Sequence, residues 1–517
     1  MGARVRDEHG VERWVLAASI LGSSMAFIDG TVVNVALPVL QRALGATATQ
    51  VQWVVEGYSL CLAALLLLGG ALADKVGRRR IFALGVALFA AASVGCASAP
   101  TIHWLIAARA IQGLGAALLV PTSLALLGAG FPEERRGRAI GKWSAFSAAT
   151  AGVGPVLGGW LIQVASWRWV FWINVPIAVT TFFITLRWVP ESRDEHAHRL
   201  DVPGAALATL GLGALVFGLL EGPRLGIGNP AILASLGGSV FLLAGFVVVE
   251  QRSPAPMVPL DLFRSRTFTG ANLLTLLLYA ALAGVFFFVP FDLIQVHRYS
   301  PAAAGAAMLP LILLLSLLSG WAGRLADRYG VRVLLIVGPM IAGVGFALLA
   351  VPGASGPYWT TFFPAMVVLG LGMSATVAPL TTAVMTCFGR ERAGVASGIN
   401  NAVSRTAGLL SIALFGLVAY ERFGTSLLRR ADALGVPLAV RELLAKERGK
   451  LAAAVLPRSL PEALHRKLEQ AVDLAFVDAF RLVMLLAAGL AIAAAGMAWL
   501  LIQGGKSPAA GSSKRRD

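Results

Sequence analysis

The sequence predicts an all-α integral membrane protein of fourteen spanning helices, built as two similar six-helix bundles with two further helices inserted between them. Three observations support this fold class: an apolar composition, basic loops that alternate along the chain, and an internal repeat. Of the 517 residues, 57% are hydrophobic and 14% are charged, and the mean hydropathy is +0.76. Soluble domains carry about 25% charged residues, so the composition excludes a soluble protein.

The apolar runs are each long enough to cross a bilayer, which takes about 20 residues as a helix. The first run does not resemble a cleavable signal peptide, because it is too long, contains Asp29 and Pro38, and lacks a small-residue cleavage site. We expect spans at about 14–37, 51–72, 81–99, 103–128, 139–162, 169–188, 203–221, 230–250, 268–292, 302–323, 332–351, 359–386, 394–418 and 479–502.

Lys and Arg gather in every second loop and in both tails, which explains the net charge of +16 as membrane topology. The short loops of the opposite side carry one basic residue each, or none; the four are Arg42, Arg168, Arg224 and Arg298. This is the positive-inside pattern. It predicts a multi-pass protein of the cytoplasmic membrane with both termini in the cytoplasm. Because topology accounts for the positive charge, we expect no nucleic-acid partner.

One connection breaks the alternation. Residues 419–478 form a long polar insert before the last span, and we expect it on the outer side. Its Leu and Ala spacing predicts one or two short amphipathic helices, lying on the membrane or capping the exit; a solvated cap without a specific role is the simpler interpretation. The expected divisions are an N-terminal bundle at 1–188, inserted helices at 189–266, a C-terminal bundle at 267–502 and a cytoplasmic tail at 503–517.

Two sequence patterns occur twice. "GALADKVGRRRI" at 70–81 recurs as "GRLADRYGVRVL" at 323–334, and "GLGAALLVP" at 113–121 is echoed by "GLGMSATVAP" at 370–379. Six spans per half plus two inserted spans account for the offset. Such a repeat predicts two halves related along the membrane normal.

The first repeated pattern lies in a basic loop. A loop that only sets topology would explain Arg78 and Arg79. It would not explain the glycines and the aspartate, which allow close helix approach, helix capping and a tight turn. These residues are Gly70, Asp74 and Gly77 in the first copy and Gly323, Asp327 and Gly330 in the second.

Charged residues inside the apolar runs are the main candidates for function. Asp29 lies in "MAFIDGTVVNVALP" (25–38), where an ionised carboxylate costs roughly 2.5–3.5 kcal/mol. Arg109 lies inside the apolar run of the fourth span and is followed by Gln112 and Gly113. Counting about 1.5 Å per residue places Asp29, Arg109 and Glu56 within about one helical turn of the same depth, so the three could meet if the first, second and fourth spans belong to one bundle. A structural Asp29–Arg109 pair that never titrates is the alternative.

Further candidates are weaker. Arg405 lies in the middle of the thirteenth span, and Asp292 at the outer end of the ninth could serve transport or simply contact interfacial water. Cys61, Cys96 and Cys387 have no metal-ligand spacing and are expected as core residues. No glycine-rich phosphate loop is present, so we expect no bound nucleotide. We also expect no metal and no other cofactor.

The fifth span carries "GKWSAFSAATAGVGPVLGG" at 141–159. A Gly-Pro pair interrupts helical hydrogen bonding, and small residues provide a packing face. Either a kink or a packing surface would explain the pattern. Its residues are Gly141, Gly154, Pro155, Gly158 and Gly159.

Together these motifs resemble those of the major facilitator superfamily, in its fourteen-helix drug:proton antiporter group, over about 14–502. The resemblance implies that the repeated loop is a conformational latch and that Arg109 acts in proton transfer. It also implies that the fifth-span motif distinguishes exporters from importers. Thr150 stands where that motif has a glycine, a departure that leaves its other positions matching.

The expected function is therefore proton-coupled export of small amphipathic organic compounds by alternating access, not an enzymatic reaction. Substrate, protons and bilayer are the expected partners of a monomer, and a host with two membranes could add a periplasmic adaptor. A dedicated exporter of an endogenous metabolite, lipid or siderophore uses the same scaffold. A membrane enzyme acting on lipid-linked substrates is the remote alternative, and 419–478 holds no coherent nucleophile or metal set for it.

Overall fold

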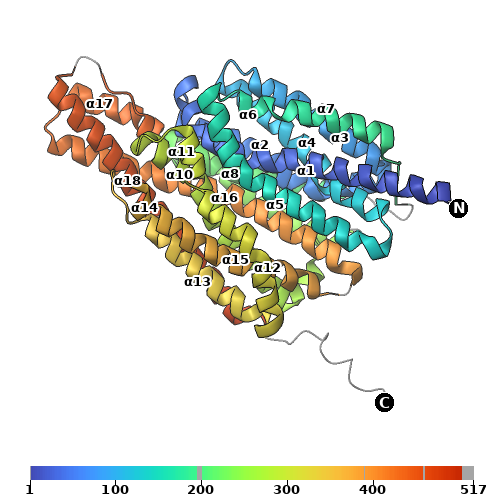
Figure 1. Ribbon diagram of the computed structural model, residues 1–517. Helices are drawn as coiled ribbons and strands as arrows, with labels where there is room; N and C mark the ends of the chain where they lie inside the picture. Colours follow the sequence, from blue (N-terminus) through green and yellow to red (C-terminus); the bar gives the residue numbers. More distant parts are fainter. Residues whose placement is uncertain (1, 195–200, 255, 389, 458–459, 504–517) are drawn as a thin grey trace. The chain divides into compact units, whose positions relative to one another are not determined.

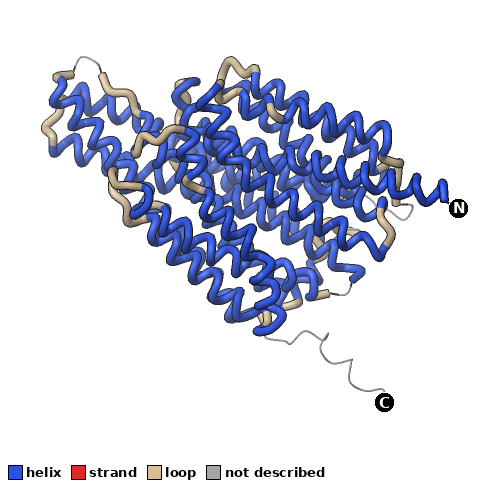
Figure 2. The backbone as a smooth tube through the Cα atoms, viewed as in Figure 1, coloured by secondary structure: helices blue, strands red, loops and turns tan. Residues whose placement is uncertain are grey.

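The computed structural model describes residues 2–194, 201–254, 256–388, 390–457 and 460–503. Throughout these residues the regular structure is helical, without a strand (Figure 2).

The helices follow one another along the chain as labelled in Figure 1. In the first part they are α1 (Gly2–Leu44), α2 (Ala48–Val76), α3 (Arg78–Ala97), α4 (Ile102–Gly130), α5 (Glu133–Val164), α6 (Trp169–Trp172), α7 (Asn174–Trp188), α8 (Val202–Leu225) and α9 (Pro230–Arg252). They continue as η1 (Leu260–Arg264), α10 (Arg266–Phe291), the π-helical η2 (Asp292–Val296), α11 (Pro301–Ala306), α12 (Leu309–Tyr329), α13 (Val331–Leu349), α14 (Tyr358–Thr361) and α15 (Phe363–Thr386). The last are α16 (Arg390–Ala433), α17 (Leu438–Glu447), η3 (Arg448–Ala453) and α18 (Glu462–Leu501).

Fourteen helical segments of the described chain are long and apolar enough to cross a membrane, which confirms the predicted number of spans. Their ends differ from the prediction because a helix can continue past the apolar run that defines its span. Helix α1, for example, passes through Pro38 and ends only at Leu44.

The insert at 419–478 is helical over most of its described residues. Its first part continues α16 to Ala433, and its last part is the beginning of α18 at Glu462, so these two are extensions of spanning helices. Between them lies one separate short helix, α17, with Val440 and Leu444 buried on one face, as the prediction of one or two short amphipathic helices expects. The 3₁₀-helical η3 follows it. The two extensions are joined by Asp478, whose Oδ2 accepts hydrogen bonds from Ser426 at 2.6 Å and Arg430 at 2.8 Å.

By its internal contacts the chain divides into two compact units. The first comprises 1–259, 286–306 and 408–482, and the second comprises 260–285, 307–407 and 483–517. The division into two six-helix halves with inserted helices remains a prediction.

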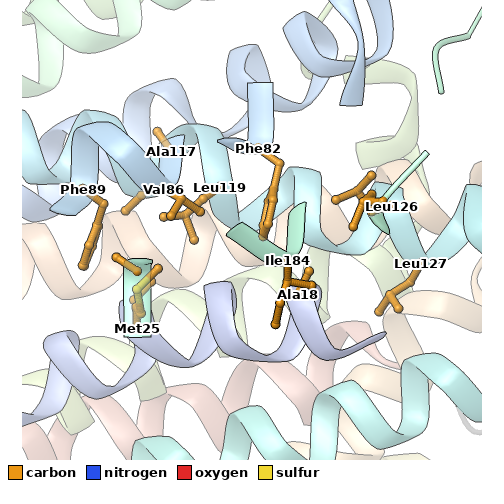
Figure 3. Close-up of a cluster of buried hydrophobic side chains, with 14 of the residues drawn as sticks. Ala18, Met25, Phe82, Val86, Phe89, Ala117, Leu119, Leu126, Leu127 and Ile184 are labelled. Atoms are coloured by element: carbon orange, nitrogen blue, oxygen red, sulfur yellow. The ribbon is translucent and has the colours of Figure 1, made fainter. Parts of the chain in front are cut away.

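An apolar core lies in the first unit between α1, α3, α4 and α7. Figure 3 shows Phe89 of α3 near Met25 of α1, and Phe82 of α3 near Ile184 of α7. Phe82, Phe89 and Met25 are fully buried. Large side chains fill this core where the helices are apart, whereas glycines bring them together elsewhere.

The two Gly-Leu-Gly patterns place their glycines in the same way. In the first unit, Gly113 of α4 lies against the Tyr58 carbonyl of α2, and Gly115 lies against Phe89 of α3. In the second unit, Gly370 of α15 lies against Leu311 of α12, and Gly372 lies against Ala342 of α13. Each pattern thus packs one helix closely on two others, and the sequence repeat corresponds to a repeated packing arrangement.

The two copies of the loop pattern also share their geometry. Gly77 ends α2 and precedes α3 with φ +132°, and Gly330 ends α12 and precedes α13 with φ +84°. Each glycine amide donates to the carbonyl four residues earlier, Ala73 or Ala326. Positive φ favours glycine, which explains why the pattern keeps it at this position.

The close contact at Gly113 gives a test of the packing. Alanine stabilises a helix interior by about 0.5–1 kcal/mol over glycine, but a Cβ at Gly113 would press on the Tyr58 backbone. We expect Gly113→Ala to lower the unfolding free energy by about 1–3 kcal/mol, the usual cost of overpacking. Thermal unfolding of the detergent-solubilised protein measures this.

Gly128→Ala in the same helix is the matched control, since a Cβ there meets nothing within 4 Å. It should leave the unfolding temperature unchanged or raise it. Equal losses from both variants would contradict the close α2–α4 contact.

Candidate functional site

A buried ion pair joins α1 and α4. The Nη1 atom of Arg109 lies 2.5 Å from Oδ2 of Asp29, and the two side chains are 2% and 0% exposed. Because both charges are away from water, each depends on the other and on neighbouring polar groups for stabilisation.

Three further side chains complete the carboxylate's surroundings. Gln112 of α4 and Asn174 of α7 donate to Oδ1 of Asp29 at 2.9 and 3.2 Å. Both amides also donate to the Ser93 hydroxyl of α3, at 2.8 and 3.4 Å. We call Asp29, Ser93, Arg109, Gln112 and Asn174 the Asp29 network. The carboxylate joins α1 to α4 and α7, and the Ser93 hydroxyl joins α3 to the same two amides.

The guanidinium has contacts besides the carboxylate. Its Nε donates to the Val54 carbonyl at 3.0 Å, and its Nη1 donates to Oε1 of Gln112 at 2.7 Å. Its Cζ also lies 4.2 Å from the centre of the Tyr58 ring, a cation–π contact. Gln112 therefore contacts both charges of the pair, accepting from one and donating to the other.

The predicted meeting of Asp29 and Arg109 is confirmed by this contact, but Glu56 does not join them. Its side chain is fully buried, yet neither carboxyl oxygen has a hydrogen-bond partner among the described residues.

Sequence reasoning missed three members of this site. Asn174 belongs to "SWRWVFWINVP" at 166–176, and that recognisable stretch was the available signal. Ser93 and Tyr58 carried no signal, because a single hydroxyl in an apolar span is also common in helix packing.

Asp292 is buried rather than in contact with interfacial water. It begins the π-helical turn η2, and its Oδ2 lies 3.3 Å from Nδ1 of His297, with both side chains at most 3% exposed. Residue spacing does not predict this pair, since a π-helical turn is not recognisable from residue pattern. Arg405, the other weaker candidate, is partly buried in α16, within electrostatic reach of Tyr279.

The first latch motif is built around a segment that the sequence did not single out. Asp74 accepts from Arg78 Nε at 2.8 Å, and its own carbonyl accepts from the Asp194 amide. Glu191 accepts from the Arg79 amide at 3.0 Å and lies against Gly77. The segment after α7 thus holds the turn between α2 and α3, while Gly70 lies beside Pro121.

The second copy is less enclosed. A Cβ at Gly323 or Gly330 would meet nothing within 4 Å. The side chain of Asp327 lies outside the part of the chain that the structure describes.

The fifth-span motif is a packing surface. A Cβ at Gly154 or Gly158 would fall against Thr31 or Val32 of α1, so these glycines let α1 and α5 approach closely, as their ribbons do in Figure 1. On the other side, Gly159 faces the Pro301 carbonyl, and the Pro155 carbonyl faces Gly305 of α11. Gly141 is exposed, with nothing within 4 Å of a Cβ.

Within the described residues, no three His, Cys, Asp or Glu side chains gather as a metal site would require. The site contains instead the Asp29–Arg109 ion pair, and protonation of Asp29 would remove the charge attraction within it.

Known proteins resemble the chain in sequence. A family model described as Major Facilitator Superfamily matches residues 19–412. Multidrug resistance protein Stp of Mycobacterium tuberculosis is 36% identical over 409 residues, covering 78% of this chain and 75% of that protein. The tetracenomycin C resistance and export protein of Streptomyces glaucescens is 32% identical over 487 residues, covering 93% of this chain and 90% of that protein.

Solved structures resemble the chain in fold. A bacterial homologue of the human lysosomal transporter Spinster, in an inward-facing and occupied conformation, matches with a TM-score of 0.67 and 18% identity. The match covers 95% of this chain and 96% of that one. At this identity the match supports the fold and nothing more specific.

The Asp29 network predicts an asymmetric response to mutation. Asp29→Asn leaves Arg109 buried without its counter-charge, which typically costs about 3–5 kcal/mol of unfolding free energy. Replacing both partners, Asp29→Asn with Arg109→Gln, should recover a large part of that loss. Thermal or denaturant unfolding in detergent measures both values.

Asp432→Asn is the control, because Asp432 pairs with Arg441 at 2.8 Å where both side chains are about half exposed. Such pairs contribute about 0–1 kcal/mol. If Asp29→Asn costs no more than Asp432→Asn, the buried pair does not have the importance that we give it.

Proposed function

The chain belongs to the Major Facilitator Superfamily, and from this membership we propose that it exports amphipathic organic compounds in exchange for protons. The family membership makes it a multi-pass membrane transporter related to drug-resistance exporters, not an enzyme. Substrate class, direction and proton coupling are the proposal.

The observation that supports coupling is the buried Asp29 network. Within the described part of the chain, the hydrogen-bond partners of the Asp29 carboxylate are all donors: Arg109, Gln112 and Asn174. Such surroundings stabilise the ionised carboxylate. A protonated Asp29 would lose the attraction of Arg109, so proton binding and the α1–α4 contact are linked.

Gln112 gives the Arg109 guanidinium a hydrogen-bond acceptor other than Asp29. When Asp29 takes a proton, the guanidinium keeps the Gln112 carbonyl, the Val54 carbonyl and the Tyr58 ring as its partners. The charge of Arg109 would then remain stabilised while α1 moves. Return of the proton to water would restore the pair, completing one cycle.

The energy available is sufficient for useful export. Moving one charge across the membrane yields about 2.3 kcal/mol per 100 mV, which would support a gradient of roughly fortyfold.

The outward direction is supported by the fifth-span motif, because the family motif that it resembles distinguishes exporters from importers. Gly154 and Gly158 pack α5 on α1, the helix that carries Asp29, and Gly159 packs it on α11. Movement of Asp29 would therefore be passed to α5 through contacts that leave no room for a side chain. The basic loops predict that both termini lie in the cytoplasm, and export would then carry the substrate out across the cytoplasmic membrane.

Efflux from inside-out vesicles tests the proposal. A fluorescent amphipathic cation should accumulate in energised vesicles that contain the protein, and an uncoupler should abolish this accumulation. Accumulation that persists with the uncoupler would refute antiport. A panel without any transported dye, together with transport of one cellular metabolite, would favour a dedicated exporter.

Asp29→Asn gives the sharper prediction. In detergent, adding a transported compound to the purified protein should release protons, and the variant should release fewer because its amide carries none. Uncoupled or abolished efflux should accompany this loss. Asp432→Asn, exposed and outside the network, should behave as the unmodified protein does. Unchanged proton release and intact efflux in Asp29→Asn would leave Asp29 as a structural residue.

A further inference from the structure

Glu56 is a buried carboxyl group that the Asp29 network does not use. It lies in α2, is 0% exposed, and has no hydrogen-bond partner for either oxygen within the described part of the chain. Asp29, at a comparable depth, has three donors. An isolated buried carboxylate is so costly that such a group is normally found neutral.

The face of α2 that carries Glu56 points away from the Asp29 network. Residues three or four apart lie on one face of a helix, so Glu56 shares its face with Gln52, Trp53 and Leu60. Gln52 donates to the Ile412 carbonyl of α16 at 3.3 Å, and Trp53 donates to Glu221 of α8 at 3.1 Å. This face therefore meets α8 and the second half of α16, not α4.

The surroundings at this face are apolar. Val216 and Leu220 of α8 form a buried cluster with Leu409 and Ala413 of α16, and the side chains of Trp53 and Leu60 pack against it. Leu60 also lies within 3.3 Å of a Cβ position at Gly213. Glu56 stands between Trp53 and Leu60 along α2, which places its carboxyl at the edge of this cluster.

Charged groups on the adjoining helices have other partners or lie elsewhere along them. Glu221 of α8 accepts from Trp53 and from Arg224. On α16, Arg405 precedes Leu409 by one turn and is within electrostatic reach of Tyr279, and Glu421 and Arg422 follow Ala413 by more than two turns. Arg109 of α4 is paired with Asp29.

We propose that Glu56 is a second proton-binding site, separate from the Asp29 network, and that the inserted helix α8 creates it by covering the carboxyl with apolar side chains. The site holds one proton as a neutral carboxylic acid while α8 and α16 pack on α2, and the proton leaves when water reaches the carboxylate. Its use in transport rests on the proposed antiport; its protonation does not.

Infrared spectroscopy of the purified protein in lipid tests the protonation directly. At pH 7.5, the difference spectrum between the unmodified protein and Glu56→Gln should contain the carbonyl band of a protonated carboxyl, and Asp29→Asn should retain this band. Because glutamine resembles the neutral acid in shape, Glu56→Gln should also unfold at an unchanged temperature, unlike Asp29→Asn. A difference spectrum without this band overturns the proposal.

Two tryptophan variants, compared with each other, test the role of α8. Trp53→Phe removes the hydrogen bond to Glu221 and loosens α8 on α2, so water should reach Glu56 and its proton affinity should fall roughly tenfold, read from the pH at which the band disappears. Trp104→Phe is the control, since Trp104 donates to the Gly95 carbonyl at an exposed position. Equal midpoints in both variants would refute the role of α8.

These measurements are independent of transport. Uncoupler-insensitive efflux would defeat the proposed antiport and leave the Glu56 band as it is. Loss of the Glu56 site with intact coupled efflux would defeat this inference alone.

Discussion

A membrane interior offers no water to stabilise a charge, so each ionised group in a span must find its partners within the protein. Among the described residues that constraint is met at Asp29, whose carboxylate accepts from Arg109 and Gln112 of α4 and from Asn174 of α7. The packing of α1, α3, α4 and α7 is arranged around this pair. Movement of any of these helices would change the partners of a charge, and this connects the fold with the proton coupling that we propose.

The second recurring principle is close approach at glycine. Gly113 and Gly115 in the first unit, and Gly370 and Gly372 in the second, bring a central helix against two others in corresponding ways. Such contacts contribute van der Waals packing, the main attraction available between helices in lipid. The correspondence explains why the Gly-Leu-Gly pattern is repeated in the sequence although the surrounding residues differ.

The number of spans, the repeat and the Asp29–Arg109 pair could be predicted because each depends on position along a helix, which residue counting gives. Which neighbouring helix a side chain faces depends on how the helices pack, and counting residues along one helix does not predict this. This is why Glu56 was expected near Arg109 but faces α8 and α16 instead. Asp292 beside His297 was missed for a related reason, since a local π-helical turn changes the direction in which the side chains point.

Helix α9 has a role different from that of its neighbour α8. It packs on α8, and much of its surface consists of large side chains that no other part of the described chain covers, such as Val240 and Phe241, at 67% and 80% exposure. These outer positions require only an apolar side chain that is compatible with lipid, so many apolar residues are suitable there. They are suitable attachment points for spectroscopic labels, which would report on the surrounding lipid without disturbing the Asp29 network.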